Sequence, residues 1–207
     1  MNNIIRAIFL FTAMSSASYA TMSKDQCRNA DWNLIGFEDG TKGYAADRID
    51  QHRQVCSKYK VVPDMAAYTT GRNKGLQNYC TPQNGYRVGQ STTDYTDVCP
   101  RELDESFRKA FDYGNQILLH QQEIDRYQQD VKKYQQSKRD IEQKISENDA
   151  LIAKDANGPA VRAHLIDENR ELRGYVSEDQ DRIDRAQYEI EQIQRLVQEL
   201  QDNNPYR

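Results

Sequence analysis

The chain has 207 residues, of which 37% are hydrophobic and 29% are charged, and its formal net charge is -4. Together with a mean hydropathy of -0.95, this composition excludes a protein built from membrane-spanning helices and argues against one large hydrophobic core. The length allows one large domain or two small ones. We find no nucleophile motif, phosphate-binding loop or dinucleotide fingerprint in the sequence. It therefore predicts a non-enzymatic protein that needs no cofactor.

Residues 1–20 have the ordered features of a secretory signal peptide. A short n-region with one positive charge precedes a brief apolar stretch, residues 7–14, and Ser18 and Ala20 place small residues at the -3 and -1 positions of a cleavage site. The apolar stretch is far shorter than the ~20 residues of a spanning helix. A lipoprotein is the closer alternative, but the first cysteine, Cys27, follows Lys-Asp-Gln rather than small apolar residues. We therefore expect a soluble periplasmic protein.

The charge of the chain beyond the signal is unevenly distributed. Residues 21–101 carry a net charge of +2, whereas residues 102–207 carry -7. Recognition of phosphate groups needs clustered Lys and Arg side chains. The acidic second half therefore disfavours nucleic acid and anionic lipid as its main partner.

All four cysteines lie in the first half, at Cys27, Cys56, Cys80 and Cys99. An even number of cysteines in an exported protein predicts disulfides, here two, with three possible pairings. We favour Cys27 with Cys56, because a helix leaving the first and another returning towards the second would bring them together. We also favour Cys80 with Cys99, which would close a Gly/Thr-rich loop. A redox-active pair is disfavoured, since no C-x-x-C spacing occurs.

Residues 21–101 are predicted to form a small helical head stapled by these disulfides. Ser23-Lys24-Asp25-Gln26 matches a capping box that opens a helix. We expect a second helix over residues 47–58 and a third from Pro63-Asp64 to about Tyr79. Residues 81–100, rich in Gly, Thr and Pro, are predicted to be mostly loop.

Two glycines four residues apart recur three times in the head. The pairs are Gly36 and Gly40, Gly71 and Gly75, and Gly85 and Gly89. On a helix this spacing puts both glycines on one face, where another backbone can approach closely. We favour tight helix–helix packing over the alternative, a repeated surface that grips a ligand.

These positions belong to a longer ordered motif. It comprises Cys27-Arg28-x-x-Asp31-Trp32-x-x-x-Gly36-Phe37-x-Asp39-Gly40, then Asp50-x-His52-Arg53-x-x-Cys56, then Pro63-Asp64-x-x-Ala67-Tyr68-x-x-Gly71-x-x-x-Gly75-Leu76-x-x-Tyr79-Cys80-Thr81-Pro82-x-Asn84-Gly85. The motif resembles a family of bacterial envelope proteins catalogued as a domain of unknown function, DUF2799. The resemblance covers roughly the first half of the mature chain and implies a Gram-negative envelope setting. Many members look like lipoproteins, from which this chain departs, and no activity or catalytic residue carries over.

The second half, residues 102–207, has the pattern of a heptad seam on each side of a break at Gly158-Pro159. The favoured positions are Leu103, Phe107, Ala110, Gly114, Ile117, Gln121, Ile124, Gln128, Val131, Tyr134, Lys138, Ile141, Ile145, Asn148 and Ile152, then Val161, Leu165, Glu168, Leu172, Val176, Asp179, Ile183, Ala186, Ile190, Ile193, Val197 and Leu200. We expect two antiparallel helices, residues 103–154 and 160–202, packed as a coiled coil.

Polar residues interrupt this seam, namely Gln121, Gln128, Lys138, Asn148, Glu168 and Asp179. Such residues weaken a coiled coil while favouring one register or partner. A lone hairpin with so polar a seam should be marginal. We therefore expect association through residues 102–207, most simply with another copy of the chain or with an envelope protein.

Candidate sites for chemistry are few. His52 and Cys56 are four residues apart and could form half of a zinc site, but a disulfide at Cys56 is the better interpretation, so we predict no metal site. A candidate binding surface for a glycan or peptide comprises Trp32, Tyr79, Tyr86 and Tyr95.

The predicted fold is all-α, a small disulfide-stapled helical head followed by a long antiparallel coiled-coil hairpin. The predicted function is that of a structural or adaptor element of the cell envelope. The alternative is a ligand-binding or inhibitor module in which the Gly/Tyr-rich head binds and the coil is a spacer.

Overall fold

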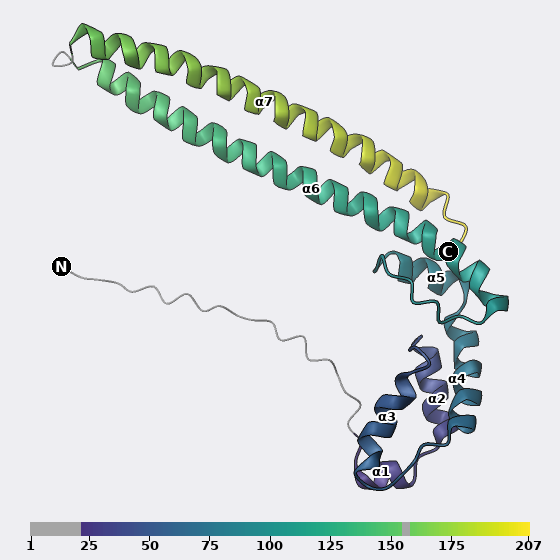
Figure 1. The fold of residues 1–207 in the computed structure, drawn as a ribbon. Coiled ribbons are helices and arrows are strands. Elements are labelled where there is room, and N and C mark those ends of the chain that lie inside the picture. The colour runs from purple at the N-terminus through teal and green to yellow at the C-terminus, as the bar shows by residue number, and fades with distance from the viewer. Residues whose placement is uncertain (1–21, 155–157) are drawn as a thin grey trace, which may run out of the picture. The chain divides into compact units, whose positions relative to one another are not determined.

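The computed structural model describes residues 22–154 and 158–207, so the predicted signal peptide lies outside the described residues. Every regular element within them is a helix, which confirms the predicted all-α class. The helices are α1 (Lys24–Arg28), α2 (Trp32–Thr41), α3 (Arg48–Ser57), α4 (Met65–Tyr79), α5 (Pro82–Gly89), α6 (Arg101–Ile152) and α7 (Pro159–Asp202) (Figure 1). Among the described residues, no helix combines the length and apolar character needed to cross a membrane.

The chain divides into two compact units, Met1–Tyr79 and Cys80–Arg207. The described part of the first unit contains α1 to α4, and the second unit contains α5 to α7. Each unit holds one of the two favoured disulfides, Cys27–Cys56 in the first and Cys80–Cys99 in the second. The second disulfide therefore belongs to the same unit as the long helices.

The first unit begins with the predicted capping box. Ser23 accepts a hydrogen bond from the amide of Gln26, and the Gln26 side chain accepts one from the amide of Ser23. The helix ends after one turn and a new one starts, because the Asp31 carboxylate accepts from the amides of Asn33 and Leu34. An aspartate that caps in this way starts a helix rather than continuing one.

The core of the first unit surrounds its disulfide. Its buried members are Cys27, Trp32, Ile49, Cys56 and Tyr68. They come from all four helices of the unit, so this small core holds α1, α2, α3 and α4 together.

The second unit begins with a helix that the sequence interpretation missed. Residues 81–100 were expected to be mostly loop, but Pro82–Gly89 is helical. Thr81 caps this helix by accepting from the amide of Asn84, and Pro82 occupies its first turn, where a missing N–H costs nothing. The glycines of this segment serve helix packing rather than loop conformation.

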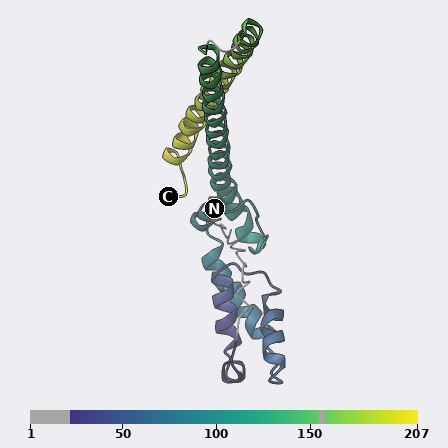
Figure 2. The same ribbon diagram turned by 90° about the vertical axis from the view of Figure 1, so that its left-hand side faces the viewer.

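The two long helices pack against each other over most of their length. Figures 1 and 2 show α7 returning alongside α6. The contacts pair early residues of α6 with late residues of α7: the Tyr113 hydroxyl donates to the Leu200 carbonyl at 2.8 Å, whereas Asn148 meets Asn169 at 2.9 Å. We call this pair of helices the hairpin. Its helices begin and end within two residues of the predicted bounds.

Buried or half-buried residues recur along the hairpin at alternating steps of three and four. They are Ile117, His120, Ile124, Tyr127, Val131, Tyr134, Lys138, Ile141, Ile145, Asn148 and Ile152 on α6, and Leu165, Asn169, Leu172, Val176, Asp179, Ile183, Ala186, Ile190, Ile193, Val197 and Leu200 on α7. We call these residues the seam. They lie close to the predicted heptad positions.

Eight predicted positions lie outside the seam, namely Leu103, Phe107, Ala110, Gly114, Gln121, Gln128, Val161 and Glu168. Gln121 and Gln128 are exposed, and the residues before them, His120 and Tyr127, are half-buried instead. The reason is that residues 107–114 of α6 face α5, so the pattern directed at α7 starts only at Ile117 and in a different phase. On α7, Asn169 is buried where Glu168 was expected, and Val161 is exposed.

Candidate functional site

The Gly-x-x-x-Gly pairs of α2 and α4 interlock. A Cβ atom placed on any of these glycines would lie 1.8 to 2.2 Å from a carbonyl oxygen of the opposite helix. The contacts are Gly36 with Tyr68, Gly40 with Arg72, Gly71 with Asn33 and Gly75 with Phe37. Since no side chain fits there, the glycines set the distance between the helices. This confirms the packing interpretation.

The third pair does the same in the second unit. A Cβ on Gly85 or Gly89 would lie 2.4 or 2.0 Å from the carbonyl oxygens of Phe107 and Phe111, respectively. In return, a Cβ on Gly114 of α6 would lie 2.2 Å from the carbonyl oxygen of Tyr86. Helices α5 and α6 are therefore held at backbone contact along residues 107–114.

The close approach of α2 and α4 creates a buried polar cluster in the first unit. Asp39 and His52 are each 5% exposed and Tyr68 is 1% exposed. One carboxylate oxygen of Asp39, Oδ2, lies 2.8 Å from His52 Nε2 and accepts a hydrogen bond from the Tyr68 hydroxyl, also at 2.8 Å. The cluster thus joins α2, α3 and α4 through one oxygen atom.

The environment of this cluster favours a charged carboxylate. Burial raises the pKa of Asp39, but the hydrogen bonds with His52 and Tyr68 and the electrostatic effects of His52 and Arg48 outweigh burial, so the pKa lies below its ordinary value of 3.8. Burial and the same hydrogen bond raise the pKa of the Tyr68 hydroxyl, which stays protonated. The second nitrogen of His52, Nδ1, is buried and has no hydrogen-bond partner among the described residues. The arrangement is that of a structural link between three helices.

The half zinc site considered at His52 is not available. Cys56 is bonded to Cys27, and the other ring nitrogen of His52 faces Asp39. Within residues 22–154 and 158–207, no group of three or more His, Cys, Asp and Glu side chains is placed to hold a metal ion.

Trp32, one of the four residues predicted to line a binding surface, is buried. It is only 8% exposed, because its ring packs in the core of the first unit, edge-on to His52 at 6.3 Å between ring centroids. The expectation of a surface role was therefore wrong for Trp32. Tyr79 is half-buried and its ring closes over Gly43, where a Cβ would lie 2.2 Å away.

Tyr95 fastens the loop between α5 and α6. Its ring lies 5.5 Å from those of Phe107 and Phe111, and its hydroxyl donates to Asp104. The guanidinium of Arg108 covers the ring at 4.6 Å. Burial, together with the bond to Asp104, raises the pKa of Tyr95. These contacts use both the ring and the hydroxyl of Tyr95.

Tyr86, the last of the four, belongs to a cluster of three tyrosines. Its ring centroid lies 6.2 Å from that of Tyr113 on α6 and 6.3 Å from that of Tyr206, which follows α7. Tyr206 meets Tyr113 edge-on at 5.8 Å. Burial raises the pKa of Tyr86, and the neighbouring Tyr113 hydroxyl adds to this. The cluster therefore joins α5, α6 and the segment after α7 through three half-buried tyrosine rings.

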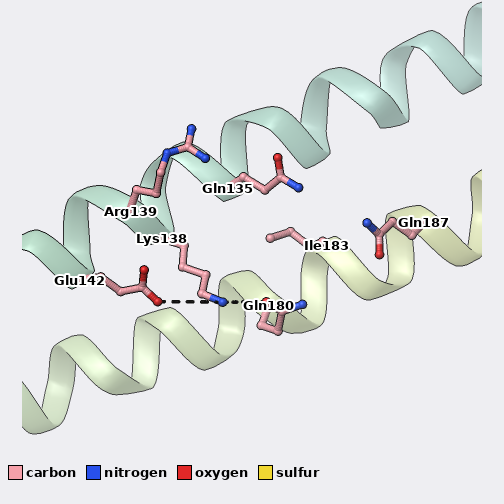
Figure 3. Close-up of a pocket in the computed structure, with 7 residues that line it drawn as sticks. All are labelled: Gln135, Lys138, Arg139, Glu142, Gln180, Ile183 and Gln187. Carbon is pink, nitrogen blue, oxygen red and sulfur yellow. Dashed lines mark hydrogen bonds and ion pairs between the residues drawn. The ribbon is translucent and has the colours of Figure 1, made fainter.

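The middle of the hairpin carries a shallow polar groove of about 360 Å³ (Figure 3). Its lining residues are Gln135, Lys138, Arg139, Glu142, Gln180, Ile183 and Gln187. Lys138 reaches from α6 across the seam and donates to Gln180 of α7 at 2.9 Å, with Glu142 at 3.9 Å. The lysine predicted to interrupt the seam is therefore satisfied by polar partners rather than packed against apolar ones.

A second polar layer crosses the seam closer to the connection between the helices. Asn148 donates to Asn169 and to Glu168, both at 2.9 Å, and Asn169 donates to Asp149 at 2.7 Å. Both asparagines are almost fully buried, and Asn148 Oδ1 has no partner among the described residues. Buried amides of this kind favour one register of a helix pair over others.

Comparison with protein families gives one result. Residues 31–116 match the model described as "Protein of unknown function (DUF2799)". The resemblance is confirmed. The DUF2799 segment contains α2 to α5 and the part of α6 that contacts α5, and it ends directly before Ile117, where the seam towards α7 begins. The glycine contacts and the Asp39 cluster thus lie within it.

No curated protein and no solved structure matches the chain.

Sequence interpretation did not find the Asp39–His52–Tyr68 cluster. All three residues belong to the ordered motif, but they are 13 and 16 positions apart in the chain. Only the packing of three helices brings them together. An acid and a histidine in a motif otherwise made of structural residues were the available signal.

Proposed function

We propose that the chain is an exported, non-enzymatic structural or adaptor element of the bacterial cell envelope, with the hairpin as its association element. In this proposal α6 and α7 form an antiparallel coiled coil, which binds a second copy of the chain or docks onto an envelope complex.

The observation that carries the proposal is the seam. Eleven buried or half-buried positions on each helix follow the heptad alternation without interruption. Several of them are polar, including Lys138, Asn148, Asn169 and Asp179. A helix pair gains most of its stability from an apolar face, so a seam this polar favours further partners.

Apolar side chains on the outside of the hairpin support the same conclusion. Those at least 39% exposed are Leu119, Leu151, Val161, Ile166, Tyr175, Tyr188 and Leu196. A helix pair that needs no partner is expected to carry polar residues there.

Two features support export. The described cysteines form two disulfides, which persist in oxidising compartments and are rare in the cytosol. The order of charged, apolar and small residues in positions 1–20 is that of a signal peptide.

The association is tested by light scattering of the mature chain over a concentration series. We expect a molar mass of at least twice the monomer that falls on dilution. Ile183→Asp, which buries a charge in the seam, should give monomers with reduced helicity, whereas Gln194→Asp adds the same charge at an exposed position and should change neither. Docking onto another protein is tested in cells by a photo-crosslinker at Leu151. A monomer at every concentration that also crosslinks to nothing contradicts the proposal.

A further inference from the structure

The tyrosine cluster of the second unit is built by a backbone contact. Because Gly114 lets α6 approach the carbonyl of Tyr86, with a notional Cβ only 2.2 Å from it, the rings of Tyr86 and Tyr113 project side by side from two different helices. A larger residue at position 114 would separate the rings. Both tyrosines lie within the DUF2799 segment.

The third ring comes from a segment that belongs to no helix. After α7 ends at Asp202, residues 203–207 turn so that Tyr206 stacks on Tyr86 with an angle of 29° between the ring planes and meets Tyr113 edge-on at 73°. Pro205 cannot continue a helix, and Pro205 and Tyr206 lie in a turn. In Figure 1 the end of the chain accordingly lies beside α5 and the start of α6.

Few other contacts hold this segment. The amide of Tyr206 bonds within the segment, to Asn204, and the Arg207 guanidinium donates to the carbonyl of Gln201. The Tyr113 hydroxyl is used by Leu200, on α7 itself. Residues 203–207 thus meet the Tyr86–Tyr113 pair through the Tyr206 ring, and the charge of the Arg207 guanidinium acts on the Tyr86 hydroxyl.

We propose that the Tyr86–Tyr113 pair is a binding site for an aromatic side chain on a peptide turn, occupied in this chain by its own Tyr206. The partner is a segment of another protein in which a tyrosine follows a proline, as Tyr206 follows Pro205. Residues 203–207 then act as an internal competitor that such a partner displaces.

The geometry explains both the ligand class and the competition. Two tyrosine rings from different helices accept a third ring by stacking on one and edge-to-face contact with the other, arrangements that aromatic pairs prefer. Proline restricts the backbone of the free peptide and so lowers the entropy lost on binding. A tethered occupant has an effective concentration in the millimolar range, so the intact chain resists weak competitors. The inference does not depend on association through the hairpin.

The test uses the full mature chain and a synthetic peptide with the sequence of residues 200–207, whose binding is measured by NMR titration. We expect the Tyr206→Ala chain to bind this peptide at least tenfold more tightly than the unaltered chain. A peptide in which the tyrosine is replaced by alanine should not bind. Tyr86→Leu in the Tyr206→Ala chain should abolish binding, whereas Tyr188→Ala, at an exposed tyrosine of α7, should leave it unchanged.

Equal binding by the Tyr206→Ala and unaltered chains, or no binding by either, overturns the proposal. A second arm mixes the Tyr206→Ala chain with a Tyr86→Leu chain, which supply a vacant site and a free segment. Light scattering should show no higher molar mass for the mixture than for either chain alone at the same total concentration, since association through the hairpin is the same in all three samples. A higher mass for the mixture would mean that the occupant is a second copy of this chain rather than another protein, and the proposed partner would be wrong.

Discussion

Replacing Gly71 by alanine should destabilise the first unit, although alanine is the better helix former. In an exposed helix this change stabilises by about 1 kcal/mol. At Gly71, however, the new Cβ would lie 1.8 Å from the Asn33 carbonyl oxygen and 2.7 Å from its carbon, both backbone atoms. Ordinary contact begins near 3.4 Å, so α2 and α4 must separate by more than an ångström. Overpacking of this kind typically costs 1–3 kcal/mol and occasionally more.

We therefore expect Gly71→Ala to lower the free energy of unfolding by roughly 2 kcal/mol or more. Trp32 is the single tryptophan of the chain and lies in the core of the affected unit, so its fluorescence during urea titration reports on this unit alone. The matched control is Gly174→Ala on α7, where nothing lies within 4 Å of a new Cβ. Circular dichroism should show that change to be neutral or stabilising, by up to about 1 kcal/mol. If Gly71→Ala were as stabilising as Gly174→Ala, the backbone contact between α2 and α4 would be refuted.

Three further changes test other parts of the fold. Because the pKa of Asp39 is lowered in the folded chain, its carboxylate contributes stability that is present above the unfolded pKa and is lost as the pH falls through and below about 3.8. Asp39→Asn should therefore lower the free energy of unfolding by roughly 1–3 kcal/mol near neutral pH and reduce the dependence of the urea midpoint on acid pH. An unchanged pH dependence would contradict the assignment. Replacing Cys80 and Cys99 together by alanine should lower the free energy of unfolding of the second unit by about 3 kcal/mol, measured by thermal denaturation. An unchanged stability would show that the disulfide does not restrict the unfolded chain. Asn148→Leu should destabilise the hairpin by leaving Asn169 without its buried partner. Leucine at both positions should recover stability but allow more than one register, which would be seen as multiple inter-helix crosslinks. If the loss of stability in the double variant equals the sum of the losses in the two single variants, the two asparagines are not directly coupled.

Much of the local structure could be predicted because its signals are local. The capping box at Ser23, the helix over residues 48–57 and the two long helices depend on capping residues and apolar spacing within one segment. The favoured pairing of Cys27 with Cys56 followed from the expected helix directions, and that of Cys80 with Cys99 from the loop expected between them. Glycine pairs four residues apart predicted close helix packing, although not which helices would meet.

The missed features are those in which a local signal had two meanings. Thr81-Pro82 is compatible with a loop or with the start of a helix, and contact of Gly85 and Gly89 with α6 decides for the helix. The heptad pattern of α6 was read as one continuous seam. It changes phase before Ile117, because the preceding residues face α5 rather than α7.

The all-α class, the disulfide count and the length of the helices follow from the order of residues along the chain, since backbone propensity, capping and cysteine content act within a segment. Which helices approach each other depends on their packing in three dimensions, and so does the placement of Asp39 against His52 and Tyr68 and of Tyr206 against Tyr86. These contacts join residues far apart in the chain. They form only where two helices approach closely, and the glycines allow that approach without specifying which helices pair.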